Sequence, residues 1–322
     1  MLRSSIFALS VFLSTLVLLS QERGQIQKQD KDYVIKVDVE LVTLPVSVFD
    51  KDGRPVDGLT QDHFQILEDN TPQKITLFKH EDIPLSVGLI IDNSGSMRNK
   101  RERVNHAALS FVRESNPDDE TFIVNFDDSA YLEQDFTSSI GDLIDALDNV
   151  DTRGETALYD ALVVSVNEMM PNAKKDKKVI LLISDGEDNA SKYGINKALE
   201  VLRAAKDITV YAVGLLEDND QRGGLFRKAP SKKAKDDLQK FAQMTGGQAF
   251  FPKSIDEVEE IVRRIAHDLR NQYTIGYTPS NANLDGTWRK IQVKVTPPKN
   301  TPKITVVTKE GYQAPGGVSQ NR

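Results

Sequence analysis

Leu85-Ser-Val-Gly-Leu-Ile-Ile-Asp92-Asn-Ser94-Gly-Ser96 is the segment that decides the fold of this chain. It begins as an apolar, β-branched run and ends in Asp-x-Ser-x-Ser. This is typical of a buried parallel strand that carries polar side chains to the carboxyl edge of an open α/β sheet. An Asp and two hydroxyls within five residues offer oxygen ligands for a divalent cation, and Gly95 allows the loop to fold back tightly. The segment therefore predicts a cation loop at the end of a strand.

Two later segments offer further oxygen ligands. Arg153-Gly-Glu-Thr-Ala-Leu158 places a threonine at the start of a predicted helix, where its hydroxyl can cap the helix or reach a ligand. Ile183-Ser-Asp-Gly-Glu-Asp188 ends another buried strand with a carboxylate. A doubly wound strand order could bring these ends together as an all-oxygen site suited to Mg²⁺. The alternative is that these residues only cap helices at strand–helix turns. The five candidates are Asp92, Ser94, Ser96, Thr156 and Asp185.

Residues 85–270 alternate between short apolar runs and segments with apolar residues at helical spacing. The runs 121–126, 179–184 and 208–213 predict strands, and the stripe 255–269 predicts a helix. Strands that alternate with helices indicate a mainly parallel sheet covered on both faces. The sequence therefore predicts a doubly wound α/β domain.

The flanks of this domain have the alternating pattern of strands. Alternation over 34–48 is followed by Phe49-Asp-Lys-Asp-Gly53, a hairpin signal because Asp-Gly supplies the positive φ of a type I′ turn. After residue 270, Tyr273-Thr-Ile-Gly-Tyr277 and 290–295 are again strand-like. Each group is too small to be stable alone. We therefore predict that they pair into one β-sandwich-like module into which the α/β domain is inserted.

Composition and the N-terminus restrict the functional class. A net charge of −7 argues against nucleic acid as a partner, and the absence of cysteine excludes thiolate chemistry and disulfides. The N-terminus has the pattern of an export signal: Arg3, then the apolar run 6–19, then the polar Ser20-Gln-Glu22. The apolar run is short for a membrane-spanning helix. Cleavage as a signal peptide and retention as an anchor both stay open. Either places the rest outside the cytoplasm, in the periplasm, in the cell envelope or secreted.

The chain divides into six predicted segments. They are a signal peptide or anchor at 1–20, a linker at 21–31, the first part of the β module at 32–82, the α/β domain at 83–270, the second part of the β module at 271–313, and a disordered tail at 314–322.

The pattern of five candidates resembles the metal-ion-dependent adhesion site of von Willebrand factor type A domains, and residues 85–270 are similar to that fold in strand–helix order. The flanking strands, with Tyr273-Thr-Ile-Gly-Tyr-Thr-Pro279, look like the secreted bacterial VWFA-related family of acidobacterial type. The resemblance implies that Ser94 and Ser96 bind the metal directly. It also implies that Asp92, Thr156 and Asp185 contact the metal directly or through water.

The same resemblance implies Mg²⁺ as the cofactor, with Mn²⁺ or Ca²⁺ as alternatives, and a partner protein that completes the coordination with a Glu or Asp. No covalent step is needed, so we interpret the chain as a binding module and not an enzyme. Two other functions stay open. One is a hydrolase that uses Asp92 or Ser94 with the metal, although no general base of fitting geometry can be named. The other is a structural envelope protein with a vestigial site.

Three further groups of residues lie near the predicted site. Asp127-Asp128 are interpreted as solvated loop acids, with groups that support the metal ligands from behind as the alternative. Asp188 and Asn189 are interpreted as turn residues, with orientation of a partner as the alternative. The segment 216–233 is predicted to be a long polar loop on the metal side of the sheet. It is either a solvated excursion or a specificity loop in which Arg222, Arg227 and Lys228 meet an acidic partner.

Overall fold

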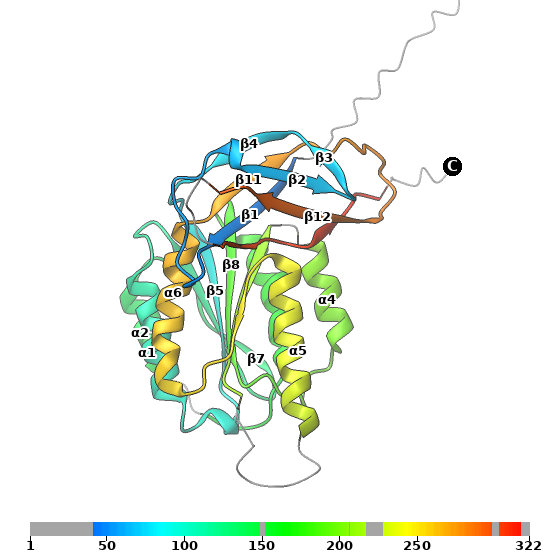
Figure 1. Cartoon of the computed structure of the whole chain (residues 1–322). Helices are drawn as coiled ribbons and strands as arrows, with labels where there is room; N and C mark the ends of the chain where they lie inside the picture. The colour runs from blue at the N-terminus through cyan, green and yellow to red at the C-terminus, as the bar shows by residue number, and fades with distance from the viewer. Residues whose placement is uncertain (1–40, 149–151, 206, 217–227, 298–302, 317–322) are drawn as a thin grey trace, which may run out of the picture. The chain divides into compact units, whose positions relative to one another are not determined.

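A mainly parallel sheet forms the centre of the α/β domain (Figure 1). The computed structural model describes residues 41–148, 152–205, 207–216, 228–297 and 303–316. Within them the sheet has six strands, and only the last is antiparallel to its neighbour. In spatial order they are β10 (Ala249–Phe250), β9 (Ile208–Gly214), β8 (Lys177–Ser184), β5 (Leu85–Asp92), β6 (Glu120–Phe126) and β7 (Ala130–Thr137). The predicted doubly wound, mainly parallel sheet is confirmed.

β5 lies in the middle of the sheet, and all eight of its residues are buried. Leu85, Val87, Leu89 and Ile91 pack into the core on one face, whereas Ile90 packs into the core on the other. This two-sided burial is what a continuous apolar run predicts for a central parallel strand.

Helices cover both faces of this sheet (Figure 1). One face carries α1 (Arg101–Arg113), α2 (Ile140–Asp148) and α6 (Val258–Arg270), and the other carries α3 (Leu158–Val164), α4 (Ile195–Ala204) and α5 (Lys228–Thr245). Short helical turns complete the described chain. They are η1 (Gln61–His63), η2 (Gly95–Met97), the π-helical η3 (Ser165–Met169), η4 (Met170–Asn172) and η6 (Ile255–Glu257).

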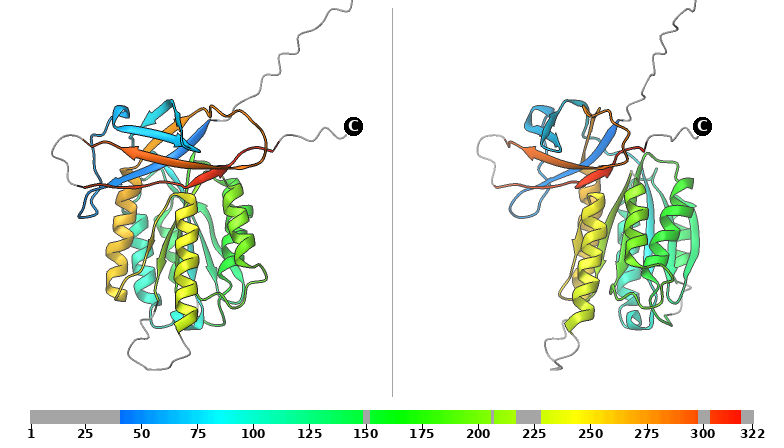
Figure 2. Two further views of the ribbon diagram at one scale, coloured as in Figure 1. Left: turned by 45° about the vertical axis from the view of Figure 1, so that its right-hand side comes forward. Right: turned by 90° about the vertical axis from the view of Figure 1, so that its right-hand side faces the viewer.

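Strands from both ends of the chain pair into two four-stranded sheets, as predicted for the β module (Figure 2). One has the order β13 (Thr305–Val307), β1 (Val42–Phe49), β11 (Tyr273–Tyr277) and β4 (Ile75–Lys79). The other has the order β14 (Gly311–Gln313), β12 (Trp288–Val295), β2 (Phe64–Glu68) and β3 (Thr71–Gln73). Leu44, Val46, Ile66, Ile275 and Tyr277 are among the residues of their shared core.

The hairpin predicted at residues 49–53 is present only in a minimal form, with Val56 N donating to Val48 O at 2.8 Å across the turn. Gly53 has the expected positive φ of 74°, but β1 continues only to an isolated bridge between Phe49 and Pro55. The positive-φ pair that joins two strands is instead Asp69 and Asn70, between β2 and β3. Both are residue types that tolerate left-handed backbone, so the turn is locally favourable.

The α/β domain leads directly into the β strands at the end of α6. Gln272, which follows this helix, is buried and donates hydrogen bonds to Ser47 Oγ (3.1 Å) and Tyr211 Oη (2.9 Å). Residues 39–322 form one compact unit, so the boundaries at 82/83 and 270/271 stay predictions. The predicted export signal and linker, residues 32–40 of the predicted β module and residues 317–322 of the tail lie outside the described residues. Disorder is wrong for the start of the tail, because Ala314 is buried and its N–H donates to Thr287 O at 2.9 Å. No helix in the described part of the chain has the length and apolar character needed to cross a membrane.

Candidate functional site

The centre of the site is formed by the adjacent ends of β5 and β8. These two strands are parallel and pair up to Ile91 and Ile183, so the residues that follow lie at one sheet edge. Asp92 ends β5 and is completely buried. Its Oδ2 accepts a hydrogen bond of 2.6 Å from Ser184 Oγ, which in turn accepts one of 2.8 Å from Gly186 N. The hydroxyl of Ser184 thereby fixes the Asp92 carboxylate from the neighbouring strand.

The loop after β5 folds back on Asp92. Ser94 N donates to Asp92 Oδ1 at 2.9 Å, and the hydroxyl oxygens of Ser94 and Ser96 lie 3.0 Å apart. Met97 is completely buried and anchors the following turn in the core. Three of the five predicted residues therefore form one contiguous group of oxygen atoms.

Thr156 reaches the same edge of the sheet through a second loop. Arg153 N donates to Asn93 O (3.0 Å) and Gly95 N donates to Gly154 O (3.1 Å), so this loop is bonded to the one after β5. Gly154 has a φ of +70°, and a Cβ there would overlap the Asp128 carboxylate. Thr156 itself is 3% exposed, just before α3. The structure thus brings Thr156 to the loop that carries Ser94.

A third loop, after Asp185, holds the Thr156 segment in place. The Thr156 N–H donates to Asn189 Oδ1 at 2.7 Å, and Thr156 O accepts from Asn189 N and Ala190 N. Asp188 Oδ2 accepts a further hydrogen bond from Tyr159 N at 3.1 Å. Asp188 and Asn189 lie in a segment without regular structure, and their side chains bind the backbone of the neighbouring Thr156 segment. The alternative role, orientation of a partner, stays a prediction.

The interpretation of Asp127 as a solvated acid is wrong. It is 5% exposed, its backbone oxygen accepts from Ala157 N at 2.7 Å, and its carboxylate accepts from Ser129 N and Arg153 Nε. Asp128 is exposed as predicted, although its Oδ1 accepts from Glu155 N at 2.7 Å. These acids can support the Thr156 loop because they directly follow β6, whose last residue, Phe126, pairs with Asp92.

Negative charge accumulates at this edge of the sheet. Burial, followed by the nearby Asp185 carboxylate, raises the pKa of Asp92 to about 6. Asp185 Oδ1 is buried and has no hydrogen-bond partner among the described residues. Two adjacent carboxylates with an unpaired oxygen, next to two hydroxyls, suit a hard divalent cation. The described residues contain no cluster of three or more His, Cys, Asp or Glu side chains that could hold a metal ion.

The predicted loop 216–233 is shorter than expected. Helix α5 begins at Lys228, and its buried stripe of Leu238, Phe241 and Ala242 extends back to Ala234. Arg222 and Arg227 lie outside the described residues. The role of the 216–233 segment in partner specificity stays a prediction.

Three contributors were missed from the sequence: Ser184, Arg153 and the Asn189 side chain. Each bonds a segment that is distant along the chain, so the spacing of residues in the sequence does not reveal it. Only Ser184 could have been found from the sequence. It directly precedes Asp185 at the end of its strand, and adjacent parallel strands place it beside Asp92.

Residues 87–187 match the family model of the von Willebrand factor type A domain. The matched segment starts within β5, extends past the end of β8 and includes all five predicted residues. Together with the sheet order, this match shows that the chain contains a von Willebrand factor type A domain. The closer resemblance to the acidobacterial-type family stays a prediction.

Similar proteins cover this chain only in part. The uncharacterized protein sll0103 of Synechocystis sp. is 28% identical over 138 residues, or 41% of this chain, which spans about a third of that relative (32%). Proximal thread matrix protein 1 from the mussel byssus is 21% identical with a TM-score of 0.49, covering 63% of this chain and 50% of that one. A von Willebrand factor type A protein from Catenulispora acidiphila is 12% identical with a TM-score of 0.49, covering 85% and 74%.

Proposed function

We propose that this chain is an exported, Mg²⁺-dependent protein-binding module of the adhesion type, and that it is not an enzyme. The metal would be held by Asp92, Ser94, Ser96, Thr156 and Asp185. The observation that carries the proposal is the buried, unpaired Oδ1 of Asp185 beside the buried Asp92 carboxylate. Such a charge pair is costly unless a cation or a proton neutralises it.

The residues of the chain prepare this site in two ways. Ser184 and the Ser94 backbone fix both oxygens of Asp92, while Asn189 fixes the backbone of Thr156. Bound Mg²⁺ supplies a positively charged coordination position that a Glu or Asp of the partner can fill. Because the ligand loops are preorganised, little conformational entropy is lost when a partner binds.

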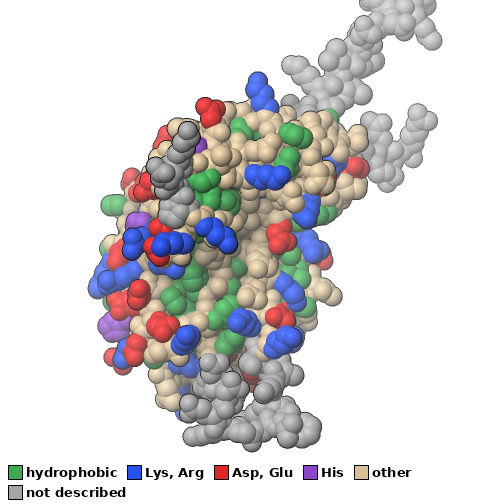
Figure 3. All heavy atoms as spheres, in the orientation of Figure 1, with side chains coloured by type: hydrophobic (Ala, Val, Ile, Leu, Met, Phe, Trp, Pro, Cys, Tyr) green, Lys and Arg blue, Asp and Glu red, His purple; other side chains and the backbone are tan. Residues whose placement is uncertain are grey.

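Export is proposed from the N-terminal pattern alone, with residues 1–20 as a signal peptide or an anchor. A mixed surface charge agrees with a protein partner and not with nucleic acid. On the face shown in Figure 3, Lys and Arg side chains are interspersed with Asp and Glu.

Calorimetric titration of EDTA-treated protein with MgCl₂ tests the metal site. We expect saturable binding that is lost in Asp92→Ala, while circular dichroism shows that the variant is still folded. Mn²⁺ and Ca²⁺ titrated in the same way test the alternative metals. Absence of Mg²⁺ binding at millimolar concentration would favour the structural protein with a vestigial site.

Affinity capture from envelope extract tests the binding function. The partner should be retained in Mg²⁺ and released by EDTA, and Asp92→Ala should retain none. Capture that is equal in EDTA and with Asp92→Ala would refute metal-dependent binding. Turnover in an esterase and phosphatase screen that disappears with EDTA would support the hydrolase instead.

A further inference from the structure

Arg153 is bonded directly to the loop that carries the metal-site serines. Its backbone N–H donates to Asn93 O, and the next residue, Gly154, accepts from Gly95 N. These two hydrogen bonds, 3.0 and 3.1 Å long, lie on either side of Ser94 in the sequence. Arg153 therefore belongs to the immediate rim of the site, although its side chain takes no part in the predicted metal coordination.

The Arg153 side chain is restrained by a hydrogen bond from its Nε, and most of the side chain is exposed to solvent. Nε donates to Asp127 Oδ2 at 3.3 Å, and the Asp127 carboxylate is itself buried and held by Ser129 N. The phenol of Tyr131, which is 42% exposed, interacts with the same guanidinium. The Arg153 side chain is 72% exposed. Since Nε is one of five N–H donors, a restrained guanidinium keeps donors for an external acceptor.

The surroundings of Arg153 limit the charge that a partner can carry. Asp127 balances the guanidinium, and the exposed carboxylates of Asp128 and Glu155 lie on the same loops. A strongly acidic partner would therefore be repelled. A partner with only a few carboxylates, one at the metal and one at Arg153, could still bind.

We propose that Arg153, with Tyr131 beside it, is a second recognition point for an acidic partner segment, one carboxylate of which completes the metal while another pairs with Arg153. This inference rests on the proposed function, because the metal must hold the first carboxylate. Arg153 is a specificity residue in this scheme, and the metal site itself does not need it.

Four peptides, acetylated and amidated at their ends, serve as probes. One carries a single Asp in a Gly-Ser background, and the others carry two Asp separated by one, two or three residues. Their affinities for the full chain are measured by calorimetry in Mg²⁺ and in EDTA. The best two-Asp peptide should bind about three- to tenfold more tightly than the single-Asp peptide, the range for a partly exposed charge-assisted pair.

Arg153→Gln should remove this preference, because the guanidinium that would pair with the second carboxylate is lost while the backbone N–H that holds the Ser94 loop is kept. Mg²⁺ titration of the same variant, by calorimetry, separates loss of the second contact from damage to the metal site. Tyr131→Phe should reduce the preference in part, and it keeps the fold because only a hydroxyl is removed. Arg113→Gln, an equal loss of charge at the other end of α1, should change nothing.

The possible failures are distinguishable. Peptide binding that depends on Mg²⁺ but shows the same two-Asp preference in Arg153→Gln overturns the role of Arg153 alone. Peptide binding that is equal in Mg²⁺ and EDTA, or no binding by any peptide, overturns the metal-dependent function and this inference with it.

Discussion

Replacing Asp268 with asparagine is expected to stabilise the protein at neutral pH. Asp268 lies in the last turns of α6 with a side chain only 1% exposed, and both carboxylate oxygens are buried without a hydrogen-bond partner among the described residues. The Nε of Arg264 is 3.8 Å away, too far for a hydrogen bond. Burial, opposed in part by the Arg264 charge, raises the pKa of Asp268 to about 7.

The sign of the pH dependence follows from this raised pKa. Well below pH 3.8, the ordinary pKa of an Asp, the carboxyl group is protonated in both the folded and the unfolded chain, so it leaves the free energy of unfolding unchanged. As the pH rises further, the unfolded chain loses the proton first, and the free energy of unfolding decreases until the folded pKa of about 7 is passed.

The rise from 3.8 to about 7 corresponds to about 4 kcal/mol at 1.36 kcal/mol per pKa unit. Asparagine avoids this cost but loses the attraction to Arg264, so we expect a gain of about 2–4 kcal/mol above pH 7.

Urea unfolding of Asp268→Asn and wild type at about pH 8 and about pH 4.5 measures this difference. The variant should be more stable at the higher pH, and most of its advantage should vanish at the lower one. Glu260→Gln, which removes a carboxylate from the exposed surface of α6, is the matched control and should show neither effect. An Asp268→Asn advantage that is equal at both pH values, or absent, would refute a buried, largely protonated carboxyl group.

Three further substitutions test the site loops and the sheet. Ser184→Ala leaves Asp92 Oδ2 without its donor, and urea unfolding in EDTA should show a loss of about 1–3 kcal/mol. Asn189→Ala releases the Thr156 backbone, so calorimetry should show Mg²⁺ affinity reduced about three- to tenfold, and unchanged affinity would contradict the positioning role. Gly88→Ala would overlap the Phe122 ring and should cost about 1–3 kcal/mol in urea unfolding, whereas Gly194→Ala, with open space around its Cβ, should not.

The buried strands were predictable because their burial leaves a continuous apolar run. β5 and β8 end in a polar residue where they reach the sheet edge, which also marked the site. β7 was missed because it is an antiparallel edge strand with mixed exposure. Tyr131 and Leu132 are adjacent in it, and both are exposed. Neither a continuous run nor an alternation identifies such a strand.

Turn chemistry predicted where the chain reverses but not which strands pair. Asp52-Gly53 does form a turn, yet β1 pairs with β11 and β13, and β2 pairs with β12. These partners lie more than 200 residues away in the sequence, on the far side of the α/β domain. Their choice depends on packing between the two sheets, which local sequence does not contain.

The five site residues could be predicted because each lies next to its own strand or helix end. Their supports could not, since they come from contacts between loops that only the folded sheet brings together. Asp127 illustrates the difference, because its sequence context is that of a surface acid. Its burial arises only because the Thr156 loop covers it through Ala157 and Arg153.

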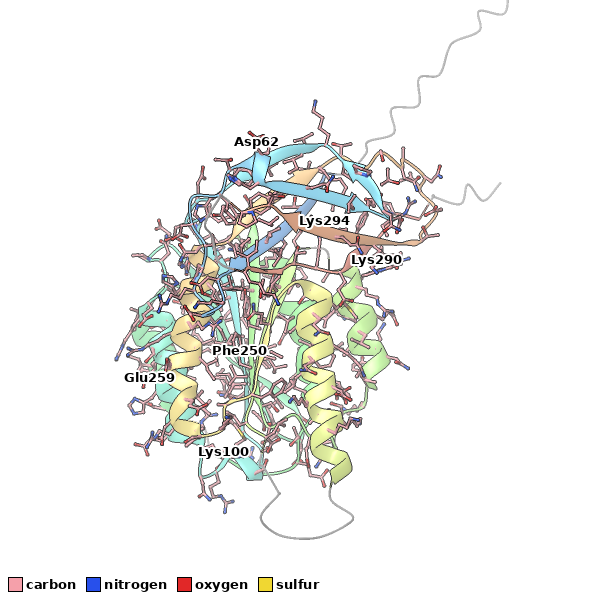
Figure 4. All side chains as sticks on the ribbon, viewed as in Figure 1. Asp62, Lys100, Phe250, Glu259, Lys290 and Lys294 are labelled. Atoms are coloured by element: carbon pink, nitrogen blue, oxygen red, sulfur yellow. The ribbon has the colours of Figure 1, made fainter. Side chains whose placement is uncertain are left out.

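The site lies at the end of the sheet remote from the β strands. β5 rises about 3.3 Å per residue, so its eight residues place Asp92 roughly 23 Å from Leu85. Figure 4 shows Lys100, just before α1, and Asp62, just before β2, at opposite ends of the molecule. Any influence between the two ends must therefore pass through the sheet or along a helix.

Helix α6 is the element that connects these ends, and it is firmly held. Its last residue, Arg270, forms ion pairs with Asp82 and the buried Asp119, and Lys177 Nζ donates to Leu269 O at 2.7 Å. Sliding the helix by one turn would separate Arg270 from the buried Asp119, at a cost of up to about 3 kcal/mol because Arg270 itself is only partly buried. A partner bound at the metal would have to supply that energy before α6 could move. These contacts therefore favour a site that stays in one arrangement when a partner binds.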